Sequence, residues 1–428
     1  MAKGEPQVTS SSEWRSGGWV VLSAAVANAA IGLPIYSLGA LMKPLSDSFG
    51  WSRSEIAAGP MILSVVAIFL VPFVGRLVDR VGPRKMGLVG LPIFAAAIAS
   101  LGLATPSIWS WYAGWLLLAF AQPVAGPLLW TSGVARRFDH SRAMALGVML
   151  CGATVTIGLA PLIAVGIMEW AGWRLVYFVL GAFVLLVPWP LVYFRFDVGP
   201  IVHLGANATH NKAAGVSLGA AVRTRRYWQM VGAVVLGSAS VGALAIHLQP
   251  SLIDGGLDRT TTALVASLLG PAALVGRLVA GFLADRIHAP AVAGVALALP
   301  GLSFLLLGGF DGSIHQAIAV AVLGGLAIGA EVDLFAYLCS RFFGQRHFGV
   351  IYGTMLSAFG LGYGAGPMVA GAIFDTTGNY SVAFYMLMLG SFLAALLVGF
   401  AGGSQKLALL RSGPPNQQTR TCSCAIEA

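Results

Sequence analysis

Twelve apolar segments, each long enough to cross a lipid bilayer, constrain this sequence more than any other feature. A spanning helix needs about 20 mostly apolar residues. The first segment begins at Trp19 and continues past Pro34 without a small-residue cleavage site, so we expect an uncleaved span. Because 57% of the residues are hydrophobic and only 10% are charged, we predict an all-α integral membrane protein and exclude a soluble enzyme or a disordered chain. The other segments cover residues 56–75, 86–104, 109–133, 143–167, 174–194, 228–249, 262–283, 290–309, 314–338, 348–372 and 382–403.

The distribution of lysine and arginine predicts how the chain is inserted. Of the 25 residues of these types, 20 fall in the terminal segments and in every second loop, and Arg277 lies inside a span. The remaining loops hold Lys43, Arg53, Arg174 and Arg259. Because positive residues gather in short cytoplasmic loops, we predict both termini on the cytoplasmic side of the cytoplasmic membrane. The net charge of +9 therefore reports orientation and not a nucleic-acid partner.

The two halves of the sequence repeat at an offset of 206 residues. Matching pairs include Arg53 with Arg259, Asp79 with Asp285, and Glu169 with Asp375. Such a repeat predicts a six-span unit duplicated in parallel. We therefore expect an N-terminal cytoplasmic segment, a six-helix bundle, a cytoplasmic linker, a second six-helix bundle and a cytoplasmic tail, at residues 1–18, 19–195, 196–227, 228–403 and 404–428.

A charged motif containing glycine lies between the second and third predicted spans. It reads GRLVDRVGPRK from Gly75, and GFLADR recurs from Gly281. A positive topology loop would explain the arginines but not the recurring glycine and aspartate. The motif resembles the cytoplasmic loop of the major facilitator superfamily, whose aspartate pairs with basic residues and a helix end and latches the halves when the outside is open. The resemblance implies that the gating loop uses Gly75, Asp79, Arg80, Gly82, Arg84, Gly281, Asp285 and Arg286.

This resemblance implies a fold and a mechanism. Two six-helix bundles would surround a central cavity, bind the substrate near mid-membrane and expose it to either side by rocking. Within the superfamily, the chain resembles the monocarboxylate transporter and oxalate/formate antiporter branch over most of its length. The stretches that carry this resemblance are GGWVV at 17–21, YSLG, KP and GWS between 36 and 52, RF and RAMALG between 137 and 147, and Arg277 four residues before Gly281.

Arg277 is the principal candidate for substrate binding. An arginine near the bilayer centre costs about 2.5–3.5 kcal/mol on insertion scales, so it needs a partner. A carboxylate fits because the guanidinium presents a planar fork of donors, and the resemblance implies that this arginine binds the substrate carboxylate. Two alternatives stay open: Arg277 reaches the inner surface, or it pairs with Glu331 or Asp333.

Tyr36 is the second candidate for substrate binding. It stands where the animal carriers have a lysine, and it resembles the tyrosine of the oxalate branch, which suggests a hydroxyl donor in the cavity. The eleventh-span lysine of the oxalate antiporter is replaced near Phe359. One embedded cation matches a monoanion better than a dianion, so we expect a small or aromatic monocarboxylate rather than oxalate.

Glu331 and Asp333 are candidates for proton coupling in the tenth span. Two residues apart on a helix, they point about 200° apart. One is expected to face the cavity and carry a proton, and the other to pair with Arg286 or Arg341 at the cytoplasmic surface. A purely structural role for both acids remains the alternative.

Together these features predict a secondary transporter that moves a small organic anion, with a monocarboxylate favoured, by alternating access and H⁺ symport. The alternatives are an anion/anion antiporter of the oxalate-formate type and an exporter of another small molecule. A membrane-embedded enzyme is disfavoured because no metal-binding or nucleophile motif occurs, and a transport-dead sensor because no signalling domain does. We expect no cofactor, no metal and no obligatory protein partner, with the substrate, protons and the lipid bilayer as partners; the Cys422 and Cys424 tail is assigned no role.

Overall fold

The computed structural model describes residues 10–138, 140–198, 215–344 and 346–411. Residues 199–214 of the predicted linker and the two tail cysteines lie outside these ranges. The N-terminal half contains α1 (Ser10–Ile31), α2 (Leu33–Phe49), α3 (Arg53–Val81), α4 (Pro83–Leu101), α5 (Ile108–Ala125), α6 (Pro127–Arg137), α7 (Arg142–Ala171), α8 (Trp173–Leu186) and α9 (Pro188–Arg195). The C-terminal half contains α10 (Leu218–Ala221), α11 (Arg225–Asp254), α12 (Arg259–Ser267), α13 (Leu269–Arg286), α14 (Ala289–Gly308), α15 (Ile314–Phe343), α16 (Phe348–Thr377) and α17 (Ser381–Arg411).

Within the described ranges, these helices form twelve candidate membrane spans, as predicted from the apolar segments. Four spans consist of two consecutive helices, with breaks at Gly32, Gly126, Val187 and Leu268. Proline follows two of these breaks directly as the first residue of α6 and of α9. Proline lacks a backbone N–H and cannot continue the preceding hydrogen-bond ladder, so the chain restarts its helix there.

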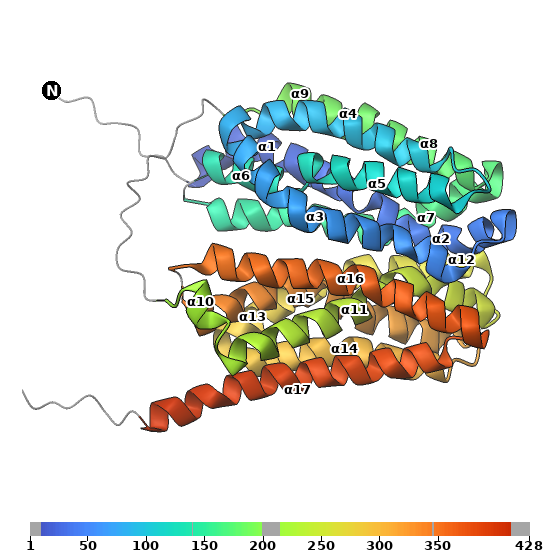
Figure 1. Cartoon of the computed structure of the whole chain (residues 1–428). Coiled ribbons are helices and arrows are strands. Elements are labelled where there is room, and N and C mark those ends of the chain that lie inside the picture. Colours follow the sequence, from blue (N-terminus) through green and yellow to red (C-terminus); the bar gives the residue numbers. More distant parts are fainter. Residues whose placement is uncertain (1–9, 139, 199–214, 345, 412–428) are drawn as a thin grey trace, which may run out of the picture.

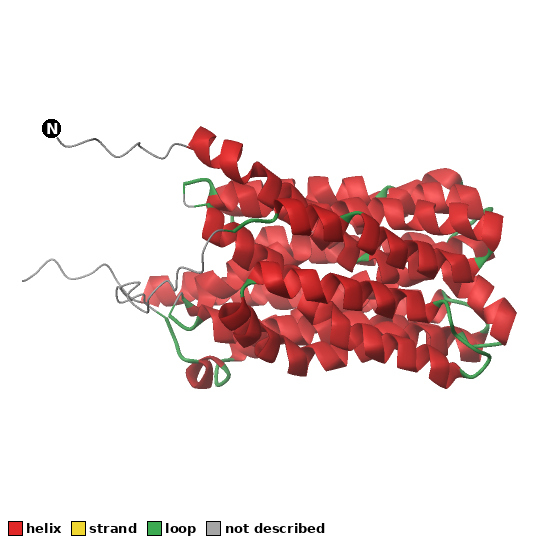
Figure 2. Cartoon of the chain, turned by 90° about the horizontal axis from the view of Figure 1, so that it is seen from above, coloured by secondary structure: helices red, strands yellow, loops and turns green. Residues whose placement is uncertain are grey.

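The helices are arranged as two bundles side by side, one for each half of the chain (Figure 1). Among the described residues, the buried apolar side chains of the N-terminal bundle form one cluster, which includes the fully buried Trp111, Trp115 and Trp130, and those of the C-terminal bundle form two. The start of α1 and the end of α17 lie at the same end of the molecule (Figures 1 and 2). We call this end the terminal face and the opposite end the far face.

The helix bounds repeat at the offset found in the sequence. Both ends of α16 lie 206 residues after the corresponding ends of α7. The start of α12 likewise lies 206 residues after the start of α3. The duplicated unit predicted from single residues therefore extends to whole helices.

Glycines allow the helices to approach closely. A Cβ on Gly366 of α16 would overlap the backbone carbonyl of Ala239 on α11, and one on Gly152 of α7 would overlap that of Ala25 on α1. Small residues are enriched where membrane helices pack because they let backbones meet. The close contact between α11 and α16 also fixes the wall of the C-terminal bundle that faces the other half.

Candidate functional site

Arg277 lies at the interface between the two bundles. Its Nε is 2.9 Å from Oδ2 of Asp333 on α15 in the same bundle. Its Nη1 donates a hydrogen bond of 3.2 Å to the carbonyl oxygen of Leu150 on α7 in the other bundle. Arg277 stands nine residues before the end of α13, about 13 Å of helix. The structure shows the alternative in which Arg277 pairs with an acid.

The two acids of α15 have different surroundings, as their spacing predicted. Asp333 is partly exposed and faces Arg277, whereas Glu331 is only 3% exposed. Neither oxygen of Glu331 has a hydrogen-bond partner among the described residues. Its Oε1 would lie 2.6 Å from a Cβ added to Gly237 of α11, so the missing side chain at that glycine makes room for the acid.

The expected pairing of one acid with Arg286 or Arg341 is wrong. The Arg286 guanidinium lies over the ring of Phe282, 3.5 Å from its centroid. Arg341 Nη1 donates to the hydroxyl of Tyr337 at 3.0 Å. Asp333 lies ten residues before the end of α15, about 15 Å of helix, so it meets the embedded arginine instead of the surface ones.

Tyr36 also lies where the bundles meet. The Tyr363 hydroxyl of α16 donates to the Tyr36 hydroxyl of α2 across the interface at 3.4 Å. The Tyr363 ring stacks on Phe359, with centroids 5.8 Å apart and planes at 19°. Both the Arg277–Asp333 pair and the Tyr36–Tyr363 contact, with the ring of Phe359 beside it, thus lie where the bundles meet.

A close contact between α7 and α13 explains how Arg277 reaches the opposite bundle. A Cβ on Gly270 of α13 would lie 2.6 Å from the backbone nitrogen of Gly158 on α7. Two glycines that face each other let the backbones approach to a distance that larger residues prevent. Two helical turns further along α13, the Arg277 side chain then meets the carbonyl of Leu150.

The charged motif at the terminal face is only partly a turn. Gly82 has φ of +90°, ends α3 and precedes α4, so it needs the left-handed freedom of glycine. Gly75 and Gly281 instead lie inside α3 and α13. A Cβ at Gly75 would make an ordinary contact with Leu128 at 3.5 Å. The turn therefore requires one of the three motif glycines.

The charged motif residues form their contacts within one bundle. Arg136 of α6 lies 3.6 Å from Asp79, and Arg84 donates to the carbonyl of Tyr193 at 2.9 Å and lies 3.8 Å from Asp197. The motif aspartate thus lies beside a basic residue, while its gating role stays a prediction. These contacts do not join the two bundles. Arg80 and Asp285 are exposed at the same face.

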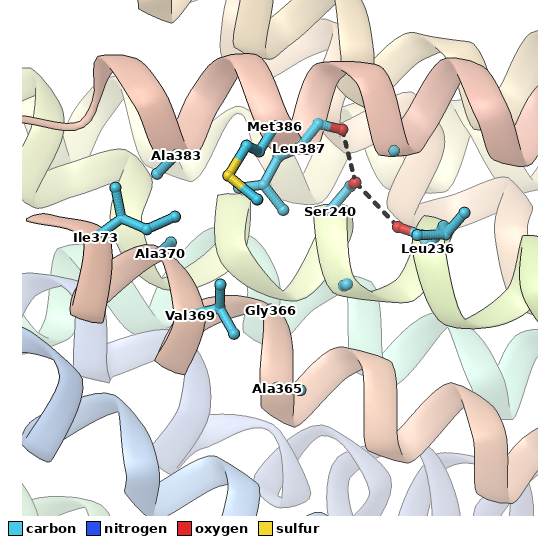
Figure 3. Close-up of a pocket in the computed structure, with 12 residues that line it drawn as sticks. Leu236, Ser240, Ala365, Gly366, Val369, Ala370, Ile373, Ala383, Met386 and Leu387 are labelled. Carbon is cyan, nitrogen blue, oxygen red and sulfur yellow. Dashed lines mark hydrogen bonds between the residues drawn. The ribbon is translucent and has the colours of Figure 1, made fainter.

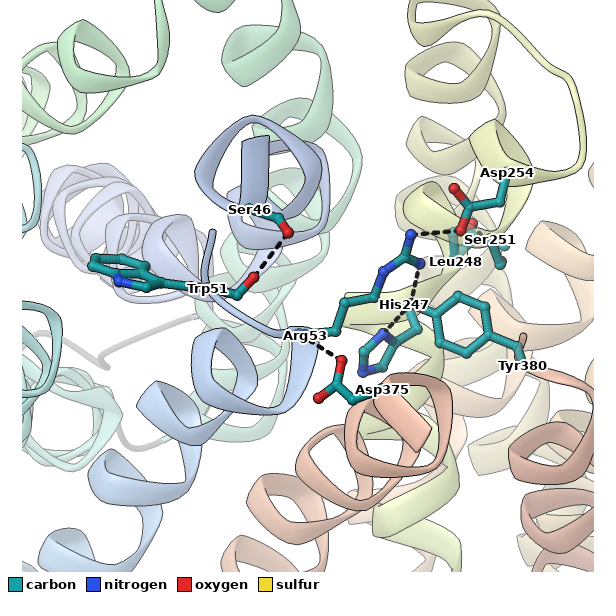
Figure 4. A network of polar contacts seen from close by, with 9 residues as sticks. All are labelled: Ser46, Trp51, Arg53, His247, Leu248, Ser251, Asp254, Asp375 and Tyr380. Carbon is teal, nitrogen blue, oxygen red and sulfur yellow. Dashed lines mark hydrogen bonds and ion pairs between the residues drawn. The ribbon is translucent and has the colours of Figure 1, made fainter. Parts of the chain in front are cut away.

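A group of polar contacts connects the bundles at the far face (Figure 4). Arg53, the first residue of α3, forms an ion pair of 2.6 Å with Asp254 of α11. Its Nη1 also donates to the Tyr380 hydroxyl at 2.6 Å, and its guanidinium lies 3.7 Å from the centroid of Phe374. The Arg53 side chain is only 12% exposed, so these contacts are largely shielded from water.

This connection continues into the C-terminal bundle through a buried histidine. His247 Nε2 is 2.8 Å from the carbonyl oxygen of Pro367, and its Nδ1 is 2.8 Å from the Tyr380 hydroxyl. A carbonyl can only accept, so Nε2 carries the proton. In the neutral ring Nδ1 then accepts from Tyr380, whose oxygen accepts from Arg53. Each donor in the chain from Arg53 to Pro367 thus meets an acceptor.

Two carboxylates in equivalent positions of the repeat accept hydrogen bonds across the interface, Asp375 from the backbone at the start of α3 and Glu169 from a side chain at the start of α12. Asp375 of α16 accepts hydrogen bonds from the backbone N–H groups of Arg53 and Ser54, at 2.9 and 3.0 Å. Glu169 of α7, which corresponds to Asp375, accepts from the Thr260 hydroxyl at 3.1 Å. We call these the far-face caps. A carboxylate at a helix N-terminus satisfies free N–H groups and is favoured by the helix dipole.

Sequence reasoning did not assign this far-face network. The sequence did single out residues of this network, because Arg53 pairs with Arg259 and Glu169 pairs with Asp375 at the 206-residue offset. The repeat shows that these positions are equivalent, but not that they face each other across the two bundles.

A separate cavity of about 180 Å³ lies between α11, α16 and α17 within the C-terminal bundle (Figure 3). Its lining is apolar apart from Ser240, whose hydroxyl donates to the carbonyls of Leu236 and Leu387. Among the described residues, no charged side chain lines it. The cavity therefore offers nothing to hold a carboxylate, and the candidate site remains at Arg277.

Comparison with known proteins fits this architecture. A family model described as Major Facilitator Superfamily matches residues 24–355 and 230–417. The chain belongs to the major facilitator superfamily. This superfamily member is 29% identical over 402 residues to monocarboxylate transporter 11 of Homo sapiens, with 88% of this chain and 82% of that protein covered. It is 24% identical over 416 residues to a gallate transporter of Pseudomonas putida, with 88% and 89% covered.

Solved transporter structures share the fold of this superfamily member. A bacterial homolog of the human lysosomal transporter Spinster, in an inward-facing and unoccupied conformation, has a TM-score of 0.69 at 17% identity, with 91% of this chain and 96% of that chain covered. A point mutant of the nucleoside transporter NupG has a TM-score of 0.73 at 13% identity, with 90% and 98% covered. The family match, the twelve candidate spans of the described residues and these relatives make the protein a multi-pass membrane transporter resembling the monocarboxylate branch, as predicted.

Proposed function

We propose that this transporter moves a small monocarboxylate across the cytoplasmic membrane together with one proton. The observation that carries the proposal is the ion pair between Arg277 and Asp333 at the bundle interface. An embedded arginine already held by a carboxylate is suited to exchange that partner for the carboxylate of a substrate. Protonation of Asp333 removes its negative charge and leaves the guanidinium to the substrate.

This exchange links the proton to the anion. When Asp333 is ionised, it neutralises Arg277 and competes with the substrate. When Asp333 is protonated and a monocarboxylate is bound, the site has the same net charge as before. Both states therefore avoid leaving the buried arginine unpaired, which is costly in a membrane. Glu331 is not needed for this cycle, because it lies apart from the arginine and is buried against Gly237.

The surroundings of Arg277 favour a substrate with one carboxylate and an apolar or aromatic body. In the resembling oxalate antiporter a second cation is present, but here the equivalent region carries Phe359. Tyr36 and Tyr363 add two hydroxyls and two aromatic rings beside Phe359. Relatives described as monocarboxylate and gallate transporters support the same substrate class.

Alternating access fits the distribution of contacts between the bundles. The far face is closed by Arg53 and by the far-face caps. We assign the far face to the outside and the terminal face to the cytoplasm, in line with the distribution of lysine and arginine. The two bundles, residues 19–195 and 228–403, would then rock about the interface that holds Arg277, and this structure would be closed to the outside.

Coupling to one proton makes the transport of a monoanion electroneutral. The membrane voltage, worth about 2.3 kcal/mol per charge per 100 mV, then does not oppose anion uptake. The pH gradient supplies the driving force. An anion/anion antiporter would use the same arginine but would need an anion on the opposite side, not a pH gradient.

Uptake of radiolabelled monocarboxylates into proteoliposomes with an imposed inward proton gradient tests the proposal. Arg277→Lys should lose most uptake, because an ammonium cannot match the planar fork of the guanidinium. Arg341→Lys is the matched control, because Arg341 donates a hydrogen bond to Tyr337 at the terminal face and not to a residue of the proposed site. The proposal fails if the gradient drives no carboxylate and Arg277→Lys transports like the parent protein.

Asp333→Asn separates symport from antiport. With a neutral residue at 333, we expect exchange of labelled for unlabelled substrate to continue while uptake no longer responds to the proton gradient. If the protein is an antiporter, uptake by the parent protein and by Asp333→Asn should both require an anion inside the vesicle, and neither should respond to the proton gradient.

A further inference from the structure

A second cavity, of about 510 Å³, opens at the terminal face of the C-terminal bundle. It is lined by the start of α11, the end of α15, α17 and the segment before α10, and none of its described lining residues belongs to the N-terminal bundle. It is therefore separate from the site at Arg277. Its polar lining comes from Thr224, Arg225, Arg226 and Gln229.

The cavity carries positive charge without an acid to balance it. Arg225 and Arg226 both line it, and none of its described lining residues is an aspartate or a glutamate. Neither arginine forms an ion pair with a residue of the described ranges, and Nε of Arg226 is buried there without a hydrogen-bond partner. The dipole of α11 adds partial positive charge at the same place. This arrangement suits an anion that brings its own oxygen acceptors.

The rest of the cavity is apolar and adjoins the membrane. Phe342, Phe343 and Phe400 line it, and the Arg226 guanidinium lies 4.9 Å from the centroid of Phe342. Phe400 on α17 is 67% exposed and lies two residues before the end of its span. A ligand held by the arginines would thus have an apolar surface beside it that leads toward the hydrocarbon region.

The position of the cavity matches the headgroup level of a bilayer. Arg225 is the first residue of its membrane span. Trp228, one turn further along α11, is 61% exposed and donates from its indole nitrogen to the carbonyl of Val222. Exposed tryptophans of this kind gather at the membrane–water interface. Basic pockets between helices on the cytoplasmic side bind the headgroups of anionic lipids.

We propose that this cavity binds the phosphate of an anionic phospholipid in the cytoplasmic leaflet, with Arg225 and Arg226 holding the headgroup and Phe400 contacting an acyl chain. A soluble phosphate would find the same cations but would gain nothing from the phenylalanines. A zwitterionic lipid would find the apolar wall but would bring no net negative charge. The combination selects a lipid with both features.

Native mass spectrometry of the full-length protein in detergent, titrated with phosphatidylglycerol or phosphatidylcholine, tests this proposal. We expect phosphatidylglycerol to remain bound and phosphatidylcholine to dissociate. Arg226→Gln should weaken phosphatidylglycerol binding about fivefold, the effect of one basic residue near a lipid surface. Arg223→Gln is the matched control, because it removes one nearby charge from an exposed residue that does not line the cavity.

Arg225→Gln provides a second variant at an exposed position, in case loss of the partly buried Arg226 impairs folding. Equal retention of the two lipids would overturn the proposal, as would equal weakening by Arg223→Gln and by the two cavity variants. Inorganic phosphate serves as the competitor. If it displaces phosphatidylglycerol completely, the cavity is a soluble-anion site and the lipid assignment is wrong.

Discussion

Removal of the Arg53 side chain at the far face is predicted to favour opening of the transporter to the outside. Arg53→Gln would abolish the ion pair with Asp254, the hydrogen bond to Tyr380 and the contact with the Phe374 ring. Its backbone N–H would still be capped by Asp375, because that contact does not depend on the side chain.

The size of the effect follows from these contacts. A hydrogen bond to a charged group contributes about 1.5–3 kcal/mol, and an arginine over an aromatic ring contributes about 0.5–2 kcal/mol. The ion pair counts for less than a fully buried one, because the Asp254 side chain is 29% exposed. We therefore expect a net loss of about 2–3 kcal/mol, which increases the ratio of open to closed far face about 30- to 150-fold.

Electron paramagnetic resonance can measure this change as a distance distribution between spin labels at Asp47 and Thr376. Both positions are exposed, and they belong to opposite bundles near the far face. The distribution should move to longer distances in Arg53→Gln. Arg259→Gln is the matched control, because Arg259 is the repeat equivalent of Arg53 and forms no ion pair with the described residues. Identical distributions in the two variants would refute the assigned role of Arg53.

Three further predictions concern packing, capping and the site. Gly366→Ala should lower the free energy of unfolding by about 1–3 kcal/mol, because the new methyl group would overlap a neighbouring backbone. Gly353→Ala, whose methyl group would meet no atom within 4 Å, should raise the free energy of unfolding slightly. Equal melting temperatures of the two variants would contradict this prediction. Hydrogen bonds from Thr261 lower the pKa of Asp258, so its stabilising effect is present above the unfolded pKa of about 3.9 and is lost as the pH falls through the lower folded value. The difference in melting temperature between the parent and Asp258→Ala should accordingly shrink below that pH, and a constant difference would count against the cap. Tyr36→Phe should raise the KM for a monocarboxylate with little change in stability, as measured by uptake kinetics and thermal unfolding, and an unchanged KM would remove Tyr36 from the proposed site.

Most of the fold could be predicted because the membrane imposes simple rules. Spans must be helical and of a certain length, so apolar segments alone indicated all twelve. The ends were less accurate, because helices continue beyond the hydrocarbon region: the segment predicted at 314–338 belongs to a helix that ends at Phe343. None of the four breaks was predicted, and the one at Leu268 has no proline at the start of the following helix to mark it.

The candidate site was predicted only in part. The cost of embedding a charge singled out Arg277 and required a partner, but helix rotation decides which acid provides it. Spacing showed that Glu331 and Asp333 face different ways, not which of them faces α13. The far-face network depends on contacts between the bundles, and a repeat within one chain does not specify which surfaces of the two copies meet.

The unequal far-face caps imply an order of events during opening. Asp375 receives two backbone N–H groups and is reinforced by the neighbouring Arg53, whereas Glu169 receives a single hydroxyl. The seam between α7 and α12 is therefore weaker than the seam between α3 and α16. When the far face opens, the two bundles would then separate first between α7 and α12 and afterwards between α3 and α16. Two identical halves would have two equal seams, so this inequality comes from the divergence of Glu169 and Asp375 after the duplication.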